Sequence, residues 1–230
     1  MTTADVEAVV GAIDQTLLKP TVGTAEGRVW IEDNAHRGFA ALCVSPFLVP
    51  DAARVLAGST TAVCSVAGFP LGYARTEAKV AEAADLVTAG CTEVDMVLNF
   101  AALLEGEDAY VRSDIATVVE AVRFASDDAA HVKVILETGH LEDSHIERGC
   151  VLAAEAGAAF VKTSTGFGPR GASVRDVEIM RAAVGDALGV KAAGGIRDLD
   201  TARAMLEAGA SRIGTSAGIE IAAQALSRAL

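Results

Sequence analysis

Two lysines stand inside apolar segments that have the composition of buried strands. Lys162 lies in AAFVKTSTGFG (158–168), and Lys191 lies in GVKAAGG (189–195). An unpaired ammonium group is costly to bury, because it loses its hydration. If the two segments are neighbouring strands, desolvation and mutual repulsion both lower the pKa of a lysine. A lysine shifted toward neutrality is a nucleophile that can form a Schiff base with a carbonyl compound.

A second interpretation gives the two lysines no chemistry. Each would pair with a carboxylate, such as Asp95 or Glu137, and fill the interior. Buried ion pairs of this kind are a poor source of stability. Because two such lysines occur beside acids and glycine-rich loops at predicted strand ends, we favour a chemical role.

The other three lysines have different surroundings. Lys19 lies in a predicted loop, and Lys79 lies in the middle of a predicted helix, where we expect it to be solvated. Lys133 opens a predicted strand, so we expect it near the opposite end of the strands from the chemistry, in a structural role.

Glycine-rich turns follow three consecutive predicted strands. They are STGFGPRG (164–171), AAGGIR (192–197) and IGTSAGIEI (213–221), the last of which leads directly into a helix. Backbone N–H groups in such loops and at a helix N-terminus bind phosphate, and glycine allows the anion to approach. We therefore expect a phosphorylated substrate.

A recurring pattern defines the elements that position these residues. Helix-like stretches end in a glycine that can adopt a left-handed C-cap, and an apolar strand follows within a few residues. The four glycines are Gly38, Gly90, Gly157 and Gly209. Further apolar runs complete eight predicted strands, near 14–18, 39–46, 61–70, 93–99, 131–139, 160–166, 189–195 and 212–216.

Alternation of helices with uniformly apolar strands is typical of a parallel sheet covered by helices. Eight units favour an α/β protein with a closed, parallel (β/α)8 TIM barrel, and an open doubly wound sheet is the alternative. Residues 1–11 predict an extra N-terminal helix. No linker or low-complexity stretch interrupts the chain, so residues 1–230 are expected to form a single domain.

The carboxyl ends of barrel strands carry the chemistry. Asp14 lies in the first predicted strand, Asp95 in the fourth, and Glu137 near the end of the fifth. The four histidines have no ligand spacing, so we expect neither a metal nor a cofactor.

Composition limits the partners. The chain has 230 residues, of which 51% are hydrophobic, and a formal net charge of −12. Such an acidic chain has little general attraction for nucleic acid or an anionic membrane. The four cysteines form no CxxC pair, and the N-terminal segment lacks the basic region of a signal peptide. We therefore expect reduced thiols and a cytoplasmic protein.

Five motifs in order resemble the deoxyribose-phosphate aldolase family over residues 13–219. They are IDQTLLKP (13–20), FPLG (69–72), EVDMVLN (93–99), VKTSTGFG (161–168) and VKAAGGIR (190–197). The resemblance implies a metal-free class I aldolase on an eight-stranded barrel. It implies reversible cleavage of 2-deoxy-D-ribose 5-phosphate to acetaldehyde and D-glyceraldehyde 3-phosphate.

The resemblance also implies residue roles. Lys162 corresponds to the Schiff-base lysine and Lys191 to the neighbour that lowers its pKa. Asp95 handles protons through a water, and Asp14 lies near the site. The expected phosphate cradle consists of Gly166, Gly194, Gly195, Gly214, Thr215 and Ser216.

Three positions depart from the family pattern. Arg170 replaces a common glycine. Its side chain either reaches the phosphate or is a solvated loop residue, and we favour the second alternative. Ala217 replaces a frequent serine, and the chain ends in ALSRAL (225–230) without the tyrosine that assists proton transfer in some members.

Two other functions stay open. One is a related class I aldolase for another phosphorylated sugar, and the other is a catalytically silent barrel that binds a sugar phosphate. A homodimer or higher homo-oligomer is compatible with either.

Overall fold

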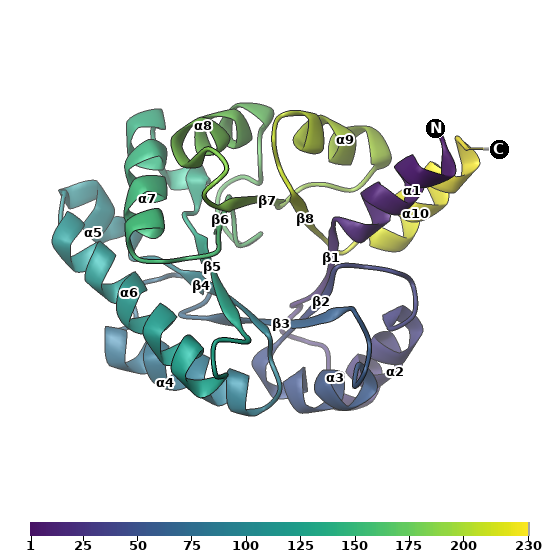
Figure 1. Ribbon diagram of the computed structural model, residues 1–230, viewed down its shortest axis with the longest axis horizontal. Helices are drawn as coiled ribbons and strands as arrows, with labels where there is room; N and C mark the ends of the chain where they lie inside the picture. The colour runs from purple at the N-terminus through teal and green to yellow at the C-terminus, as the bar shows by residue number, and fades with distance from the viewer. Residues whose placement is uncertain (230) are drawn as a thin grey trace.

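A closed barrel of eight parallel strands forms the centre of the computed structural model, which describes residues 1–229. Each strand pairs with its neighbours in sequence order, and β8 closes the barrel against β1 (Figure 1). The strands are β1 (Ile13–Leu17), β2 (Ala41–Val44), β3 (Ala62–Ala67), β4 (Glu93–Val97), β5 (His131–Ile135), β6 (Phe160–Lys162), β7 (Gly189–Ala193) and β8 (Arg212–Thr215). The predicted (β/α)8 barrel is confirmed.

Helices surround the barrel, and all but α1 follow a strand. They are α1 (Thr3–Gly11), α2 (Thr24–Asn34), α3 (Val49–Val55), α4 (Thr76–Thr88), α5 (Phe100–Glu105), α6 (Asp108–Ala125), α7 (Asp143–Glu155), α8 (Val174–Val184), α9 (Leu199–Glu207) and α10 (Gly218–Ser227). Two 3-10 turns, η1 (Pro46–Leu48) and η2 (Thr138–His140), complete the elements.

The predicted extra helix is α1, which packs beside α10 and brings the two ends of the chain together (Figure 1). The amino group of Met1 donates to the carbonyl of Arg228 over 3.1 Å. Thr2 caps α1 by accepting from the N–H of Asp5, which stabilises the first turn.

The strands are shorter than the sequence predicts. The predicted segments 131–139 and 160–166 end as strands at Ile135 and Lys162. Burial continues beyond both strands, because residues 136–138 and 163–165 are buried although most of them are polar. The four glycines predicted as C-caps all have positive φ, from 78° to 110°.

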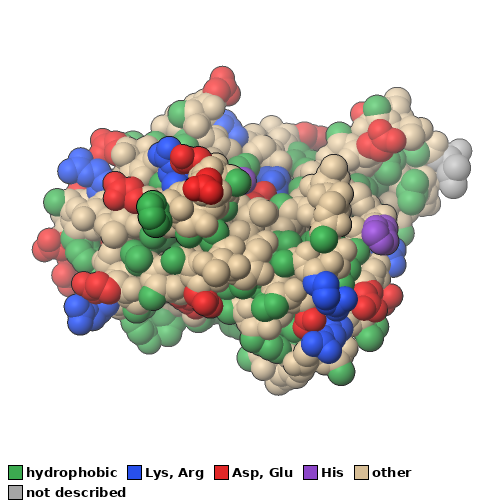
Figure 2. Space-filling view, turned by 60° about the horizontal axis from the view of Figure 1, so that its bottom comes forward, with side chains coloured by type: hydrophobic (Ala, Val, Ile, Leu, Met, Phe, Trp, Pro, Cys, Tyr) green, Lys and Arg blue, Asp and Glu red, His purple; other side chains and the backbone are tan. Residues whose placement is uncertain are grey.

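Most of the apolar core lies between the strands and the helices. Outward-facing residues such as Leu42, Val94 and Val161 are fully buried there. A second, smaller cluster of Ala41, Cys43, Cys64 and Val66 lies apart from it. At the surface, acidic and basic side chains are interspersed on the face seen in Figure 2. Across residues 1–229, no helix has the length and apolar character needed to span a membrane.

Candidate active site

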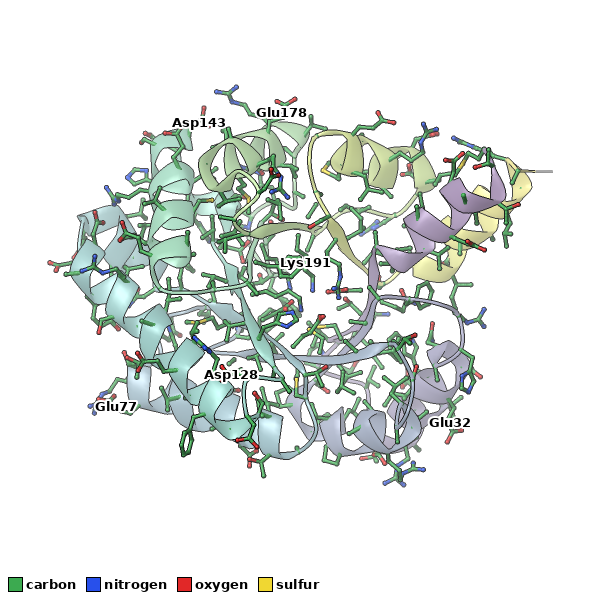
Figure 3. The ribbon with its side chains drawn as sticks, viewed as in Figure 1. Glu32, Glu77, Asp128, Asp143, Glu178 and Lys191 are labelled. Carbon is green, nitrogen blue, oxygen red and sulfur yellow. The ribbon has the colours of Figure 1, made fainter. Side chains whose placement is uncertain are left out.

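Asp95 lies at the centre of a buried charge cluster inside the barrel. Its Oδ2 atom accepts hydrogen bonds from the ammonium groups of Lys162 and Lys191, each over 2.7 Å. Its Oδ1 atom accepts from Lys133 over 2.8 Å. Asp95 is fully buried. Figure 3 shows Lys191 in the middle of the barrel.

Strand register explains why these side chains meet. Lys162 of β6 is paired with Lys191 of β7, and Asp95 of β4 is paired with Lys133 of β5. Residues paired on parallel strands point to the same face of the sheet, and here that face is the barrel interior. The two lysines therefore lie on neighbouring strands, as considered from the sequence, and at the same level of the barrel.

Two further carboxylates and an arginine extend the cluster. Lys191 lies 2.5 Å from Asp14, and Lys133 lies 2.6 Å from Glu93. Arg212 of β8 joins both carboxylates: its Nε donates to Asp14 over 2.7 Å, and its guanidinium reaches Glu93 at 2.9 Å. Asp14, expected near the end of β1, is the second residue of that strand and is fully buried.

The cluster keeps its carboxylates ionised. Burial acts to raise the pKa of Asp95, but Lys133, Lys162 and Lys191 outweigh burial and hold that pKa well below its usual range. Burial likewise opposes ionisation of Asp14, and its cationic neighbours, Lys191 foremost, lower its pKa to about 2. Both groups are therefore hydrogen-bond acceptors at neutral pH.

The same contacts keep two lysines charged. Burial acts to lower the pKa of Lys191, but the carboxylates of Asp14 and Asp95 raise it above its usual value. Burial opposes the charge of Lys133 too, and Asp95 contributes most to raising its pKa well above the usual range.

Lys162 differs from the other two lysines in this cluster. Among the described residues its only carboxylate contact is with Asp95, whereas Lys133 and Lys191 each contact at least two. The side chain of Lys162 is 4% exposed, and those of Lys133 and Lys191 are 0% exposed. Lys162 is also the last residue of its strand. Lys162 is thus the most exposed of the three lysines in this cluster.

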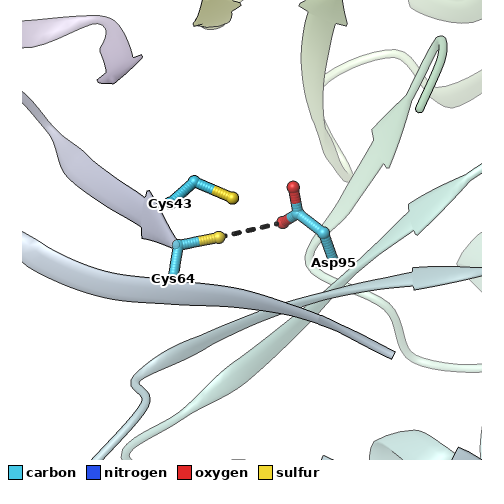
Figure 4. A group of neighbouring side chains, drawn as sticks. All are labelled: Cys43, Cys64 and Asp95. Atoms are coloured by element: carbon cyan, nitrogen blue, oxygen red, sulfur yellow. Dashed lines mark hydrogen bonds between the residues drawn. The ribbon is translucent and has the colours of Figure 1, made fainter. Parts of the chain in front are cut away.

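Two thiols border the cluster. Cys43 and Cys64 are paired in register on β2 and β3, and both are free and buried. Cys64 donates to Oδ1 of Asp95 over 3.3 Å (Figure 4). These three residues are close enough to hold a metal ion. However, a cation would have to displace the ammonium groups that already occupy both oxygens of Asp95, so the donor set does not fit a resident metal.

The glycine-rich loops after β6 and β7 contact each other. Gly166, Gly194 and Gly195 all have positive φ, the left-handed conformation that favours glycine. The N–H of Ala172, just beyond Gly171, donates to the carbonyls of Ala193 and Gly194, each over 3.1 Å. The loops after β6 and β7 are therefore in contact.

The loop after β8 joins the same group. The hydroxyl of Thr215 donates to the carbonyl of Ile196 over 2.7 Å and accepts from the N–H of Ala217 over 2.9 Å. Gly214 lies within β8, where an added Cβ would come 3.1 Å from Cε of Lys191. Ser216 is exposed. The six residues of the expected cradle thus lie on β8 and on the loops that follow β6, β7 and β8.

Arg170 is held by other residues, in contrast to the solvated loop residue that we favoured from the sequence. Its guanidinium forms a two-pronged ion pair with Asp176 of α8, with one N–O distance of 3.0 Å. It also donates to the carbonyl of Thr138 over 3.0 Å. Arg170 therefore ties the loop after β6 to η2 and α8, and is not a freely solvated residue.

The sequence-based expectations for Lys79 and Lys133 are wrong. Lys79 is fully buried and pairs with Asp114 of α6 over 2.6 Å. Lys133 lies third in β5 and contacts Asp95, so it belongs to the site rather than to the opposite end of the barrel. The sequence contained a signal for this position. Lys133 lies two residues before Ile135, and alternate residues of a strand share a face, so both side chains point into the barrel.

Glu137 was considered from the sequence as a partner for a buried lysine, and the structure shows a different contact. Its carboxylate accepts from the backbone N–H of Thr165 over 3.2 Å and from the Thr165 hydroxyl. Glu137 is 2% exposed and has a φ of 58°, which is strained for a residue with a side chain. It fixes the start of the loop that carries Gly166.

A closed eight-stranded barrel with buried lysines in its interior, one of them at the carboxyl end of β6, is typical of (β/α)8-barrel enzymes. A profile described as "DeoC/LacD family aldolase" matches residues 8–224. The chain therefore belongs to this family of aldolases, and it is a lyase.

Individual relatives agree with this family. The chain is 50% identical over 209 residues to a protein named deoxyribose-phosphate aldolase from Caldanaerobacter subterraneus subsp. tengcongensis, covering 91% of this chain and 90% of the relative. It is 50% identical over 209 residues to the protein of that name from Bacillus subtilis, covering 91% and 92%. Among solved structures, "QR15, an Aldolase" matches with a TM-score of 0.89 and 39% identity, over 96% of each chain.

A further solved structure is described as the unique tetrameric structure of deoxyribose phosphate aldolase from Aeropyrum pernix. It matches with a TM-score of 0.85 and 32% identity, covering 95% of this chain and 91% of that chain.

Proposed function

We propose that the chain cleaves 2-deoxy-D-ribose 5-phosphate reversibly to acetaldehyde and D-glyceraldehyde 3-phosphate through a Schiff base on Lys162. One observation carries the proposal: Lys162 and Lys191 share one oxygen of Asp95, and only Lys162 of the three cluster lysines has any exposed side chain. The relatives at 50% identity carry the name of this activity.

Covalent attachment begins at Lys162. Its neutral amine attacks the aldehyde carbon of the open-chain sugar and gives a carbinolamine, which loses water to form an iminium ion. The charge of Lys191 favours the neutral amine at Lys162 by repulsion. Asp95, directly or through a water, carries the proton from the carbinolamine nitrogen to its oxygen, and a second proton, equal to the one that Lys162 released on becoming neutral, lets that oxygen leave as water.

Cleavage then uses the iminium as the electron sink. A base removes the proton of the C3 hydroxyl, the C2–C3 bond breaks, and the electron pair passes to the nitrogen as an enamine. The fragment that contains carbons 3 to 5 of the sugar leaves as glyceraldehyde 3-phosphate. Protonation of the enamine carbon and hydrolysis of the resulting imine release acetaldehyde and restore Lys162. No redox change occurs in this sequence.

The phosphate is held by the loops after β6, β7 and β8. The backbone of Gly166, Gly194, Gly195, Gly214 and Thr215, with the Ser216 hydroxyl, supplies the donors. A backbone cradle gives a chain of net charge −12 a local way to bind an anion.

Borohydride trapping tests the proposal. Reduction in the presence of acetaldehyde is expected to add one ethyl group, on the peptide that contains Lys162. A coupled assay with 2-deoxyribose 5-phosphate is expected to detect glyceraldehyde 3-phosphate. A label on Lys191 or Lys133 would contradict the role of Lys162. Trapping with acetaldehyde but no cleavage of this sugar would point to another phosphorylated sugar, which a panel of sugar phosphates would identify.

Assembly and location belong to the same proposal. We infer a homodimer or higher homo-oligomer, supported by the tetramer described for the Aeropyrum pernix aldolase; sedimentation velocity measures it. We infer a cytoplasmic location, because all four cysteines are free and buried, as is usual in a reducing compartment. Cell fractionation tests this.

A further inference from the structure

The cluster around Asp95 contains one more cation than it contains carboxylates. All of its members are buried or largely buried, and within residues 1–229 they contact no other charged partner except His131 beside Glu93. We call this set the barrel charge cluster. Its cations are Lys133, Lys162, Lys191 and Arg212, and its carboxylates are Asp14, Glu93 and Asp95.

The surplus positive charge falls on Lys162. Lys133, Lys191 and Arg212 each contact two or three carboxylates of the cluster. Lys162 contacts only Asp95, through an oxygen that it shares with Lys191. When Lys162 becomes a neutral amine, three cations face three carboxylates, and the buried cluster is electrically balanced.

Balance matters because the cluster is shielded from water. A net charge in a buried site lacks the hydration that would stabilise it. The state with neutral Lys162 therefore avoids an uncompensated buried charge, and loss of a proton from Lys162 is the change that reaches this state.

We propose that Lys133 and Glu93 are positioning residues that set the protonation of Lys162 through the charge balance of the barrel charge cluster. The inference rests on the proposed function. Lys133 acts through Asp95, which it contacts at Oδ1 while Lys162 contacts Oδ2. Glu93 acts through Lys133, 2.6 Å away, and through Arg212.

Three other titratable groups face the cluster. Burial lowers the pKa of His131, which favours its neutral form. Burial raises the pKa of Cys64 well above its usual value, which keeps that thiol protonated. Contact with Cys64 lowers the pKa of Cys43. Cys43 is therefore the group that an experiment must separate from Lys162.

The test measures how fast Lys162 is ethylated by acetaldehyde and cyanoborohydride between pH 5.5 and 9.5, with peptide mapping. Acetaldehyde carries no phosphate, so substrate ionisation does not enter the profile. Lys133→Met removes a positive charge, and the midpoint of the profile is expected to move up by about one to two pH units. Glu93→Gln removes a negative charge, and the midpoint is expected to move down by a similar amount.

Two matched variants separate charge from packing. The double variant Lys133→Met/Glu93→Gln restores the original net charge, and its midpoint is expected to return to within about half a pH unit of the wild type. Lys79→Met removes an equally buried lysine between α4 and α6. It is expected to lower stability without moving the midpoint.

Several outcomes would overturn the inference. The inference is wrong if the midpoints of both single variants are unchanged or if they shift in the same direction. It is also wrong if the midpoint of the double variant does not return to the wild-type value. If the ethylation rate of Cys43→Ala no longer depends on pH, the titrating group is the Cys43 thiol and not Lys162. That result would also overturn the inference. If Lys133→Met does not fold, Glu93→Gln and the double variant decide. A wild-type protein that is not ethylated at Lys162 at any pH contradicts the proposed function itself.

Discussion

The ammonium groups of Lys162 and Lys191 donate to the same atom, Oδ2 of Asp95, over 2.7 Å each. Two like charges held this close repel each other. Lys191 is further bound by Asp14 at 2.5 Å, and the raised pKa of Lys191 keeps it charged. Lys162 has the fewest compensating contacts of the three lysines, with Asp95 as its one carboxylate partner among the described residues.

Replacement of Lys191 by leucine is expected to slow cleavage of deoxyribose phosphate by orders of magnitude at neutral pH. Without the repulsion, Lys162 loses its proton only at higher pH. At a pH below the midpoint of the pH–rate profile, each pH unit by which that midpoint rises lowers the rate about tenfold, which corresponds to about 1.4 kcal/mol of activation free energy. Activity is therefore expected to recover partly as the pH rises.

The control is Lys162→Leu, which lacks the nucleophile and is expected to stay inactive at every pH. Rates of glyceraldehyde 3-phosphate release between pH 6.5 and 9.5 measure both variants. A Lys191→Leu enzyme that is equally inactive up to its unfolding limit would mean that Lys191 does not act by charge.

The cradle is expected to tolerate loss of a hydroxyl better than a change of backbone. Ser216→Ala is expected to raise KM for the phosphorylated sugar by an amount worth about 1 kcal/mol, because one of several donors is lost. Gly195→Val is expected to raise KM far more. Gly195 has a φ of 79°, where a branched side chain is strained, and its Cβ would point into open space.

Gly58→Val is the matched control for strain. Gly58 has a φ of 77° and open space around it, but it lies in the turn after α3. We expect it to lower stability while leaving KM unchanged. Equal KM values for the Ser216 and Gly195 variants would show that the loops after β7 and β8 do not hold the anion as proposed.

The buried pair of Lys79 and Asp114 is expected to contribute to stability and not to catalysis. Both side chains are 0% exposed, and Asp114 also accepts from the hydroxyl of Thr76 over 2.7 Å. Lys79→Met leaves a buried carboxylate without its cation, so we expect unfolding to become easier by about 3 kcal/mol.

Urea unfolding at pH 7 measures this loss, and kcat is expected to equal that of the wild type. The double variant Lys79→Met/Asp114→Leu removes both charges and is expected to recover part of the stability. A single variant as stable as the wild type would contradict the assignment.

Acid is expected to destabilise the protein through Asp14. Its pKa is lowered from 3.8 to about 2, so the folded state binds the proton less readily than the unfolded chain. This contribution to stability is present above about pH 4 and is lost as the pH falls toward 2. For Asp14 alone it amounts to about 2 kcal/mol.

Urea unfolding at several pH values between 2 and 5 measures the effect. Asp14→Asn is expected to weaken the dependence of the unfolding free energy on pH. The control variant Asp127→Asn, at an exposed position, is expected to leave that dependence unchanged. A dependence that is equally steep in Asp14→Asn would mean that Asp14 is not responsible.

The sequence by itself determined the barrel, its glycine C-caps and the level of the two central lysines. These features are local: strand composition, turn residues and the spacing of repeats follow the chain. Once Lys162 and Lys191 fall on adjacent parallel strands, the period of two places them on one face. Asp95 follows from the same alternation in β4.

Only the tertiary structure decided which charges pair. Lys79 meets Asp114, Arg170 meets Asp176 beside Thr138, and Lys133 meets Asp95. A charged residue in a helix or loop is solvated unless a partner from another segment covers it. Helix packing and barrel closure fix those partners, and neither is encoded in the pattern of any one segment.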